Sequence, residues 1–263
     1  MPWDPGKYNK FRAERSAPFE DIIAMIRLRE GMSVVDLGCG TGELTRRLAD
    51  RLPASSVLGI DNSPQMLERA KEHVRPGLSF AAGDIEAVNG QWDLVFSHAA
   101  IQWVDNHQKL IPRLMSLLRP GGQLAVQLPS NHRHPSHSMI IATATEEPFR
   151  KALDGWVRVP PVLEIDKYAE LLHQSGGTEI AVFEKVYGHI MDDAGAIAEW
   201  TSGTALVPYF ERLPLELHAA FLDSYRSKLA GKWPRGPVFF TFRRILMAAT
   251  RSRGEQETSA ERQ

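Results

Sequence analysis

Cysteine is almost absent from this sequence, because Cys39 is the only one among 263 residues. A single cysteine excludes an internal disulfide and any zinc site built from cysteine pairs. No apolar run approaches the roughly 18–20 residues that a membrane-spanning helix needs. The first residues, Met1–Pro5, also lack the charged and apolar regions of a signal peptide. We therefore expect a cytoplasmic protein with no membrane partner.

An excess of charge of either sign is absent as well. Lys and Arg number 31 against 32 Asp and Glu, which gives a formal net charge of −1. Without a basic excess we expect no nucleic acid as a partner, and an anionic small molecule would need a few converging cations. The stretch Asn131–His137 holds three histidines, but no nearby acid pair or helical i, i+4 spacing supports them as ligands, so we expect no metal. The sequence carries no signal for an oligomeric state.

Short apolar runs alternate with amphipathic stretches in the first half of the chain. The apolar runs predict buried strands at Val34–Leu37, Val57–Ile60, Leu78–Ala81, Leu94–Phe96 and Leu124–Leu128, with Gln123 as an alternative start of the last. The amphipathic stretches predict helices at Glu43–Arg51, Pro64–Val74 and Gln108–Leu118. Strands that alternate with helices form right-handed parallel crossovers, so we expect an α/β fold with a doubly wound sheet.

The second half is less regular. Its periodicity predicts helices at Met139–Leu153, Ile165–Gln174, Ala194–Thr204 and Leu213–Leu229, and long strands at Thr178–Ile190 and Val238–Ala249. These two strands would lie near the far edge of the sheet and bring it to seven strands. We expect the last strand to be antiparallel. The later helices would cap the strand ends, and the polar residues 252–263 predict a disordered tail.

The strongest local signal is Val34–Gly42, where a strand turns through three glycines into a helix. Glycine reaches positive φ and carries no side chain, so a ligand can approach the backbone closely, although the glycines alone also fit a purely structural turn. A dinucleotide loop is spaced G-x-G-x-x-G, whereas here Gly42 comes one residue early and Asp36 stands just before Gly38. A carboxylate there would repel a pyrophosphate and suit a cation. The lysine of a P-loop is missing.

Two further acids stand where the next strands end. Asp61 closes the second strand, where a carboxylate can accept hydrogen bonds from both hydroxyls of a ribose. Asp84 follows the third strand, where it can accept from an adenine amino group while Ile85 packs on the ring. Either acid alone is more often a cap or turn residue. With Asp36 they stand at the ends of consecutive strands, where open sheets bind ligands, and this favours a cationic ligand that carries a nucleoside.

These positions resemble the cofactor site of class I, Rossmann-like methyltransferases, which take a methyl group from S-adenosylmethionine and release S-adenosylhomocysteine. The resemblance covers about Val34–Leu128. It implies a set of residues around the donor, namely Asp36, Gly38 and Gly40 at the methionine part, Asp61 and Asn62 at the ribose, Met66 beside the cofactor, Asp84 and Ile85 at the adenine, Ser97, His98 and Ala99 toward the acceptor, and Trp3. It also implies an N-terminal lid and helix (1–30), a cofactor-binding core (31–130), and the remaining strands with a helical cap (131–251).

More specific motifs extend over nearly the whole chain. The segments Trp3–Tyr8, Phe11–Pro18, Ala100–His107, Leu124–Asn131, Gly203–Tyr209 and Phe242–Leu246 resemble trans-aconitate methyltransferases. That family esterifies one carboxylate of a small tricarboxylate. Three residues depart from its pattern, because Ser130 stands where the family tends to have Asp, Arg243 where Pro is usual, and Val207 where Arg is usual.

A carboxylate acceptor sets the roles that its binding residues have to fill. It is already ionised near neutral pH, so alignment and the removal of water suffice and no general base is expected. Arginine is the natural clamp for it, and Arg244 stands in an otherwise apolar strand, where an unpaired charge is costly. The alternative is that Arg244 faces solvent or pairs with a structural acid, and Arg243 points to the opposite face. Further acceptor-site candidates are His98, Trp103, Tyr8, Asn131, His189 and Tyr209, followed by Arg15, Gln102 and Trp200.

Two alternatives stay open at the level of function. The enzyme class could be right and the acceptor different, for example a malonyl-thioester carrier or another natural product. A nicotinamide-dependent oxidoreductase would use a similar sheet, but Asp36 and the lack of a Tyr-x-x-x-Lys pair disfavour it.

Overall fold

The computed structural model describes residues 12–253, with side chains from residue 17 onward. Its first part contains α2 (Arg12–Ile23), β1 (Ser33–Leu37), α3 (Glu43–Ala49), β2 (Ser56–Asp61), α4 (Pro64–Ala70), η1 (Lys71–His73), β3 (Leu78–Ala82), β4 (Trp92–His98), η2 (Ile101–Trp103), α5 (His107–Ser116) and β5 (Leu118–Pro129). Its second part contains η3 (Asn131–Arg133), α6 (Pro135–Ala144), α7 (Phe149–Ala152), α8 (Ile165–Gln174), β6 (Gly177–Met191), α9 (Ala194–Ser202), α10 (Val207–Phe210), η4 (Leu215–Leu217), α11 (His218–Lys232) and β7 (Val238–Arg251).

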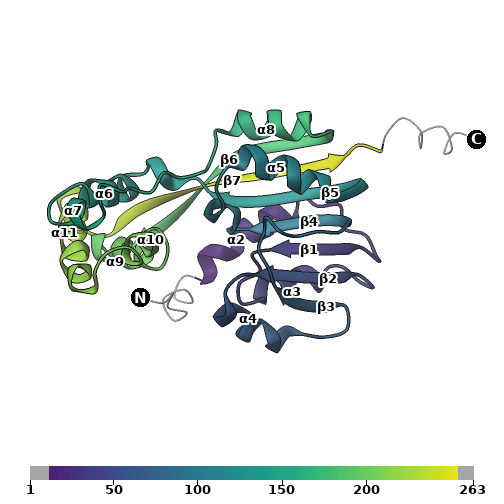
Figure 1. The fold of residues 1–263 in the computed structure, drawn as a ribbon, viewed down its shortest axis with the longest axis horizontal. Helices are drawn as coiled ribbons and strands as arrows, with labels where there is room; N and C mark the ends of the chain where they lie inside the picture. Colours follow the sequence, from purple (N-terminus) through teal and green to yellow (C-terminus); the bar gives the residue numbers. More distant parts are fainter. Residues whose placement is uncertain (1–11, 254–263) are drawn as a thin grey trace, which may run out of the picture. The chain divides into compact units, whose positions relative to one another are not determined.

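The strands form a seven-stranded sheet in the order β3-β2-β1-β4-β5-β7-β6 (Figure 1). Strands β1 to β5 pair in parallel, whereas β7 runs antiparallel to β5. The order reverses at β1, as it does in a doubly wound sheet. The predicted fold class and the antiparallel last strand are both confirmed.

The chain divides into two compact units. The sheet unit comprises Ala17–Pro129, Pro161–Lys185 and the described residues from Arg244 on. The helical unit comprises Ser130–Pro160 and Val186–Arg243.

Both faces of the sheet unit are covered by helices. Val34 belongs to a core cluster that includes residues of α2 and α3, and its neighbour Val35 belongs to one that includes residues of α5 and α8. Adjacent residues of a strand point to opposite faces, so these clusters lie on the two sides of the sheet. Burial on both faces explains why the strands are runs of apolar residues rather than alternating ones.

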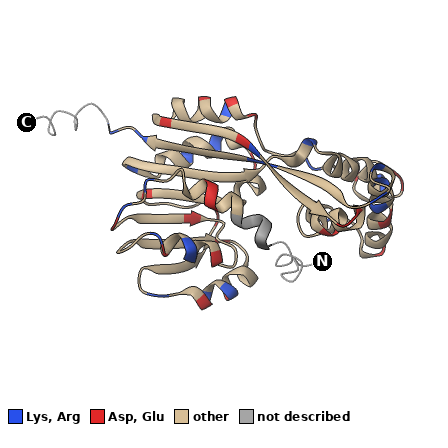
Figure 2. Ribbon diagram, turned by 180° about the vertical axis from the view of Figure 1, so that it is seen from behind, with Lys and Arg blue, Asp and Glu red and all other residues tan. Residues whose placement is uncertain are grey.

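The helical unit has its own apolar core. It is formed by large side chains that include Phe149, Phe221, Tyr225 and Phe240. No helix within residues 12–253 is long and apolar enough to cross a membrane. Acidic and basic residues are interspersed along the ribbon, which fits the near-zero net charge (Figure 2).

The start of α4 agrees with the prediction, whereas the start of β5 does not. The Ser63 hydroxyl accepts from the Met66 amide at 3.4 Å, and Pro64 opens α4 as predicted. Residues 119–122 lie inside β5 as an irregularity, because Trp92 pairs with Leu118 and Leu94 with Gln123. The start of β5 at Leu124 or Gln123 was therefore placed too late.

The single helix predicted over Met139–Leu153 is wrong. The structure has α6 and α7 there, with the Glu147-Pro148 peptide between them. Proline lacks an N–H and cannot continue the helical hydrogen bonds. The start was also predicted too late, because the His134 ring caps α6 by accepting from the Ser136 amide at 3.2 Å. The helices predicted near 194–204 and 213–229 are observed as α9 and α11, and α11 begins only at His218.

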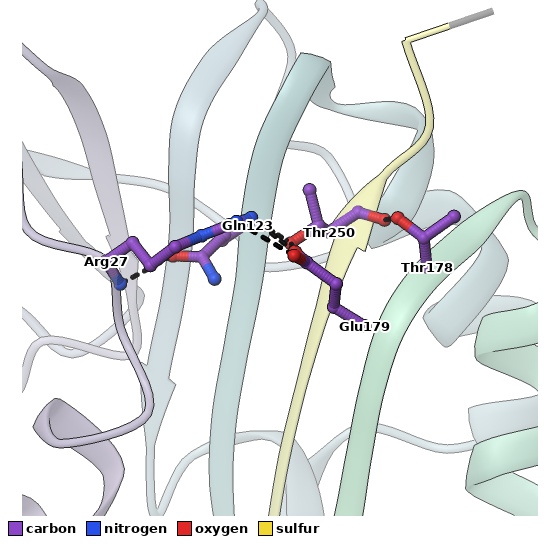
Figure 3. Close-up of polar contacts among 5 residues, drawn as sticks. All are labelled: Arg27, Gln123, Thr178, Glu179 and Thr250. Carbon is purple, nitrogen blue, oxygen red and sulfur yellow. Dashed lines mark hydrogen bonds and ion pairs between the residues drawn. The ribbon is translucent and has the colours of Figure 1, made fainter.

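A polar cluster, here called the amino-edge clasp, joins Arg27 to Gln123, Thr178, Glu179 and Thr250 (Figure 3). The Arg27 amide donates to Gln123 Oε1 at 2.8 Å, and its guanidinium donates to Thr250 Oγ1 at 2.7 Å and to Glu179 Oε1 at 3.0 Å. Thr178 Oγ1 donates to the Thr250 carbonyl at 3.2 Å. The clasp ties the segment after α2 to β5, β6 and β7 at the amino ends of the parallel strands.

Candidate active site

The carboxyl ends of the parallel strands bring the predicted acidic residues to one edge of the sheet. Asp36 of β1 pairs in register with Gly59 of β2, and Asp61 at the end of β2 pairs with Ala82 of β3. The amides of Gly38 and Cys39 both donate to the Ile60 carbonyl, at 2.8 and 3.0 Å. The glycine loop is therefore held against the end of β2, beside Asp61.

The three glycines of the loop meet different demands, although all have positive φ. A Cβ on Gly38 would lie 2.2 Å from Ala100 Cβ, and one on Gly42 would lie 2.7 Å from the Phe80 ring. These two positions need glycine so that the protein can pack. Apart from the chain neighbours of Gly40, no described residue has an atom within 4 Å of a Cβ built there, so among the described residues the loop has an open face, as a bound ligand requires.

The Asp61 carboxylate holds the glycine loop and the next turn through hydrogen bonds. Its Oδ2 accepts from the Gly40 amide at 2.9 Å, and its Oδ1 accepts from the Ser63 amide at 2.8 Å. A carboxylate has about four lone-pair sites. Each oxygen of this half-buried group thus keeps one acceptor site for another donor, such as a ribose hydroxyl.

Asp36 is buried, and its Oδ2 accepts from Thr45 Oγ1 at 2.6 Å. Burial raises the pKa of Asp36 from its ordinary 3.8 to about 7, the Thr45 hydrogen bond acts in the opposite direction, and nearby Asp61 raises it further. Near neutral pH the group therefore exchanges readily between its neutral and ionised forms. A cation close to it would favour the ionised form.

Four further residues predicted at the ribose, beside the cofactor and at the adenine lie before α4, in α4 and after β3. Asn62 and Asp84 are exposed, and Met66 and Ile85 are half-buried. Asp84 Oδ1 accepts from the Glu86 amide at 2.8 Å, which fixes the carboxyl group at the start of its turn. This part of the edge presents both polar and apolar surface.

At the end of β4, the two residues predicted toward the acceptor have different surroundings. Ser97 is fully buried, and its hydroxyl donates to the Leu37 carbonyl at 2.8 Å, so it joins the ends of β4 and β1. His98 is half-buried, with its ring centroid 5.9 Å from that of Phe19. Ala99 follows in a left-handed conformation with φ of 54°.

A buried polar network extends from His98 along the same edge. Gln127 of β5 is fully buried, and Arg244 of β7 is only 4% exposed. With the Gln127 amide turned to suit all its neighbours, its nitrogen donates to His98 Nε2 at 3.1 Å and its oxygen accepts from Arg244 Nη1 at 3.1 Å. Gln127 was not among the predicted site residues, although a lone polar side chain in the apolar run Leu124–Leu128 was a usable signal.

Three predicted acceptor residues belong to the helical unit. Asn131 is buried there, and its amide bonds backbone groups of Thr241 and Arg243, at 3.4 and 2.9 Å. The buried Tyr209 hydroxyl accepts from the Arg158 amide at 3.2 Å, and burial raises its pKa. The His189 ring lies 5.3 Å from that of Trp200.

The remaining predicted residues lie in η2 or outside the described part of the chain. Trp103 in η2 is 47% exposed, and Gln102 Nε2 donates to the Ala99 carbonyl at 2.7 Å. Trp3, Tyr8 and the side chain of Arg15 lie outside the described residues, as does nearly all of the predicted tail. In the part of the chain that the structure describes, no group of three or more His, Cys, Asp or Glu side chains is arranged to hold a metal ion.

Comparison with known proteins shows the family of the chain. Residues 28–176 match a family model described as a methyltransferase domain. YcgJ from Bacillus subtilis has a similar fold, with a TM-score of 0.59, 13% identity, and coverage of 91% of this chain and 100% of that one. Phosphoethanolamine N-methyltransferase 2 of Haemonchus contortus, solved with S-adenosylmethionine, has a TM-score of 0.53 and 18% identity. The match covers 89% of this chain and 52% of that one. The fold and the matched domain define a class I, S-adenosylmethionine-dependent methyltransferase.

Two relatives that carry the name of one enzyme match almost end to end. Trans-aconitate 2-methyltransferase of Deinococcus radiodurans is 46% identical, with 95% of this chain and 99% of the relative covered. The enzyme of that name in Variovorax paradoxus is 37% identical, with 95% and 98% covered. The chain belongs to the trans-aconitate 2-methyltransferase family. The resemblance noted in the sequence and the predicted cofactor class are thereby confirmed.

Gly40→Ala is expected to weaken S-adenosylmethionine binding by tenfold or more, on the order of 1.4 kcal/mol, because the new methyl group fills the open face of the loop. Gly31→Ala is the matched control, since Gly31 also has positive φ and no atom of the described residues beyond its chain neighbours within 4 Å of its built Cβ. Both variants should lose about 1 kcal/mol of stability from backbone strain. Calorimetric titration separates them, and equal donor affinity in the two would contradict a ligand at Gly40.

Proposed function

We propose that this protein transfers the methyl group of S-adenosylmethionine to one carboxylate of trans-aconitate, giving a monomethyl ester and S-adenosylhomocysteine. The observation that carries the proposal is a buried arginine, Arg244, in the same sheet unit as the donor loop and linked to His98 at the carboxyl end of β4. Sequence identity of 46% and 37% over 95% of the chain to enzymes named for this reaction supports the choice of acceptor.

The residues around the glycine loop fit the donor. We assign Asp36, Gly38 and Gly40 to its methionine part, since Gly40 has an open face and Asp36 can supply a negative charge to the ammonium or sulfonium. Asp61 with Asn62 would hold the ribose, and Asp84 with Ile85 the adenine, beside Met66. Ser97 would act indirectly, because its hydroxyl is already bonded to the Leu37 carbonyl.

The reaction asks little covalent chemistry of the protein. When bound, the donor would supply a methyl group on a sulfonium. A carboxylate oxygen would attack the methyl carbon in line, so that the O–C bond forms as the S–C bond breaks and its electrons pass to the sulfur of S-adenosylhomocysteine. The acceptor is ionised near neutral pH, so no residue has to remove a proton. The protein's task is to align the carboxylate with the methyl group and to strip it of water.

Arg244 is assigned as the carboxylate clamp. Its planar guanidinium can donate two parallel hydrogen bonds to a carboxylate, and its burial strengthens them because little water competes. His98 is assigned to the acceptor site beside Arg244. Trp103, His189 and Tyr8 are also proposed for the acceptor site, and Trp3 for the donor site. Asn131 and Tyr209 already bond the backbone, so we assign them to shaping the helical unit.

The departures from the family pattern all fall in the helical unit. The Ser130 amide donates to the Arg243 carbonyl at 3.0 Å, and Val207 opens α10. A difference in acceptor from the relatives would be expected to arise at these positions. A malonyl-thioester carrier or another natural product is the alternative outcome.

The deciding experiment uses S-adenosylmethionine labelled in its methyl group with trans-aconitate, cis-aconitate, isocitrate and citrate. Base-labile label in trans-aconitate supports the proposed acceptor, and absence of label from every polycarboxylate overturns it. Thermal-shift measurements with S-adenosylmethionine, S-adenosylhomocysteine and NAD test the donor independently. Stabilisation by NAD alone would overturn the donor assignment.

A further inference from the structure

Gln127 occupies the centre of the buried network at the carboxyl edge of the sheet unit. It lies on β5, between His98 of β4 and Arg244 of β7, and the ladder pairs it with both His98 and Leu246. Its side chain has no solvent exposure. An amide with a donor end and an acceptor end can satisfy two unlike neighbours at once.

The turned orientation of the amide suits both neighbours better, since the unturned oxygen lies 3.5 Å from Arg244 Nη1 and the unturned nitrogen faces donors. Arg244 can only donate, so the Gln127 oxygen faces its Nη1 at 3.1 Å and also accepts from the Leu128 amide at 3.1 Å. The amide nitrogen then donates to His98 Nε2 at 3.1 Å. A ring nitrogen that accepts a hydrogen bond carries no proton, so this contact favours the His98 tautomer with its proton on Nδ1.

The neutrality of Gln127 matters for Arg244. An acid at this position would form an ion pair with the guanidinium and compete with any carboxylate that the arginine is meant to bind. A neutral amide orients the guanidinium and adds no opposing charge beside it. Strongly held polar networks of this kind orient functional groups within buried sites.

From this geometry we propose that Gln127 is a positioning residue for the acceptor: it orients the Arg244 guanidinium toward a carboxylate and fixes the tautomer of His98, without itself touching the substrate. The inference rests on the proposed function, because Arg244 is the assigned carboxylate clamp. It goes beyond it by stating why the clamp keeps its charge and direction.

The same strand offers a matched control. Gln123 lies four residues earlier on β5, is also buried, and accepts from the Arg27 amide in the amino-edge clasp (Figure 3). It therefore performs a structural hydrogen bond at the opposite end of the strand. Loss of a buried glutamine for structural reasons alone should affect both positions alike.

The test compares Gln127→Glu, Gln127→Met and Gln123→Met in the full chain. For Gln127→Glu we expect KM for trans-aconitate to rise on the order of 100-fold, with donor Kd unchanged and Tm equal or higher because of the new Glu–Arg pair. For Gln127→Met we expect roughly a tenfold rise, since the orienting bonds are lost but no competing charge is added. Gln123→Met should lower Tm and leave KM within about twofold.

Imidazole ¹⁵N spectra provide a readout that needs no acceptor. The wild type should show one histidine locked with a protonated Nδ1, the signal should change in Gln127→Met, and it should persist in Gln123→Met. Unchanged KM in Gln127→Glu, or an unchanged His98 signal in Gln127→Met, would overturn the positioning role. If the wild type esterifies no polycarboxylate, the proposed function fails instead, and the spectra still decide whether the network exists.

Discussion

Asp36→Asn is expected to yield a protein that is more stable than the wild type above neutral pH yet no longer responds to S-adenosylmethionine. The carboxyl of Asp36 is buried, and its pKa is about 7 instead of 3.8. Because the folded state holds this proton more tightly than the unfolded chain, the contribution of Asp36 to stability is fully present below pH 3.8 and is lost as the pH rises through about 7.

The size of this loss follows from the same two values. A difference of about three pH units, at about 1.36 kcal/mol for each, amounts to roughly 4 kcal/mol. The asparagine variant carries no charge to desolvate, and its amide oxygen can still accept from Thr45. Urea unfolding at pH 4 and pH 8.5 measures the difference, which should be large only at the higher pH.

The affinity for the donor should fall in Asp36→Asn, whereas the stability rises. In the wild type, affinity for S-adenosylmethionine should rise with pH through about 7, because the ligand's positive charge favours the ionised carboxylate. The variant should bind on the order of 100-fold more weakly, with no such pH dependence. Asp50→Asn, at an exposed carboxylate, is the control and should change neither property. Wild-type donor affinity in Asp36→Asn would contradict the assignment of Asp36.

Arg244→Met is expected to reduce kcat/KM for trans-aconitate by 10² to 10³-fold, about 3–4 kcal/mol, while leaving donor Kd unchanged. The variant removes both parallel hydrogen bonds and the charge that holds the acceptor carboxylate. Arg244→Lys keeps the charge but not the fork, so an intermediate loss is expected. Initial rates over both substrates, with calorimetry of donor binding, separate these effects.

The neighbouring arginine is the control for this series. Arg243 is exposed, whereas Arg244 is buried, as expected for successive residues of a strand. Arg243→Met should change kcat/KM by less than about threefold. Because a buried cation is costly to desolvate, Arg244→Met should not lose stability. An equal kinetic loss in the two variants would contradict a clamp at Arg244.

The sheet unit could largely be predicted from the sequence. Its strands are continuous apolar runs, and the caps and glycines that bound them act through local chemistry, as Ser63 and Gly38 show. Periodicity was weaker in the helical unit, where Pro148 breaks a predicted helix in two and the His134 ring sets an unexpected start. Ring caps of this kind depend on geometry that no residue pattern specifies.

The site could be predicted where its residues belong to strand ends and could not where they depend on partners. Asp61 was expected to face a ligand, but its additional role in holding the Gly40 amide depends on the conformation of the loop. Gln127 was overlooked because one polar residue in an apolar strand gains meaning only from its neighbours on β4 and β7. For the same reason Asn131 and Tyr209, chosen for their chemistry, were found to bond the backbone.

With Asp36 at the donor, as proposed, donor binding is expected to release acid. At pH 7 about half a proton should leave the protein for each donor bound, since the carboxyl is then about half ionised beforehand. The heat observed on binding will consequently depend on the ionisation enthalpy of the buffer, and differ between phosphate and Tris at one pH. In a weakly buffered solution, donor binding would acidify the medium before any methyl group has moved.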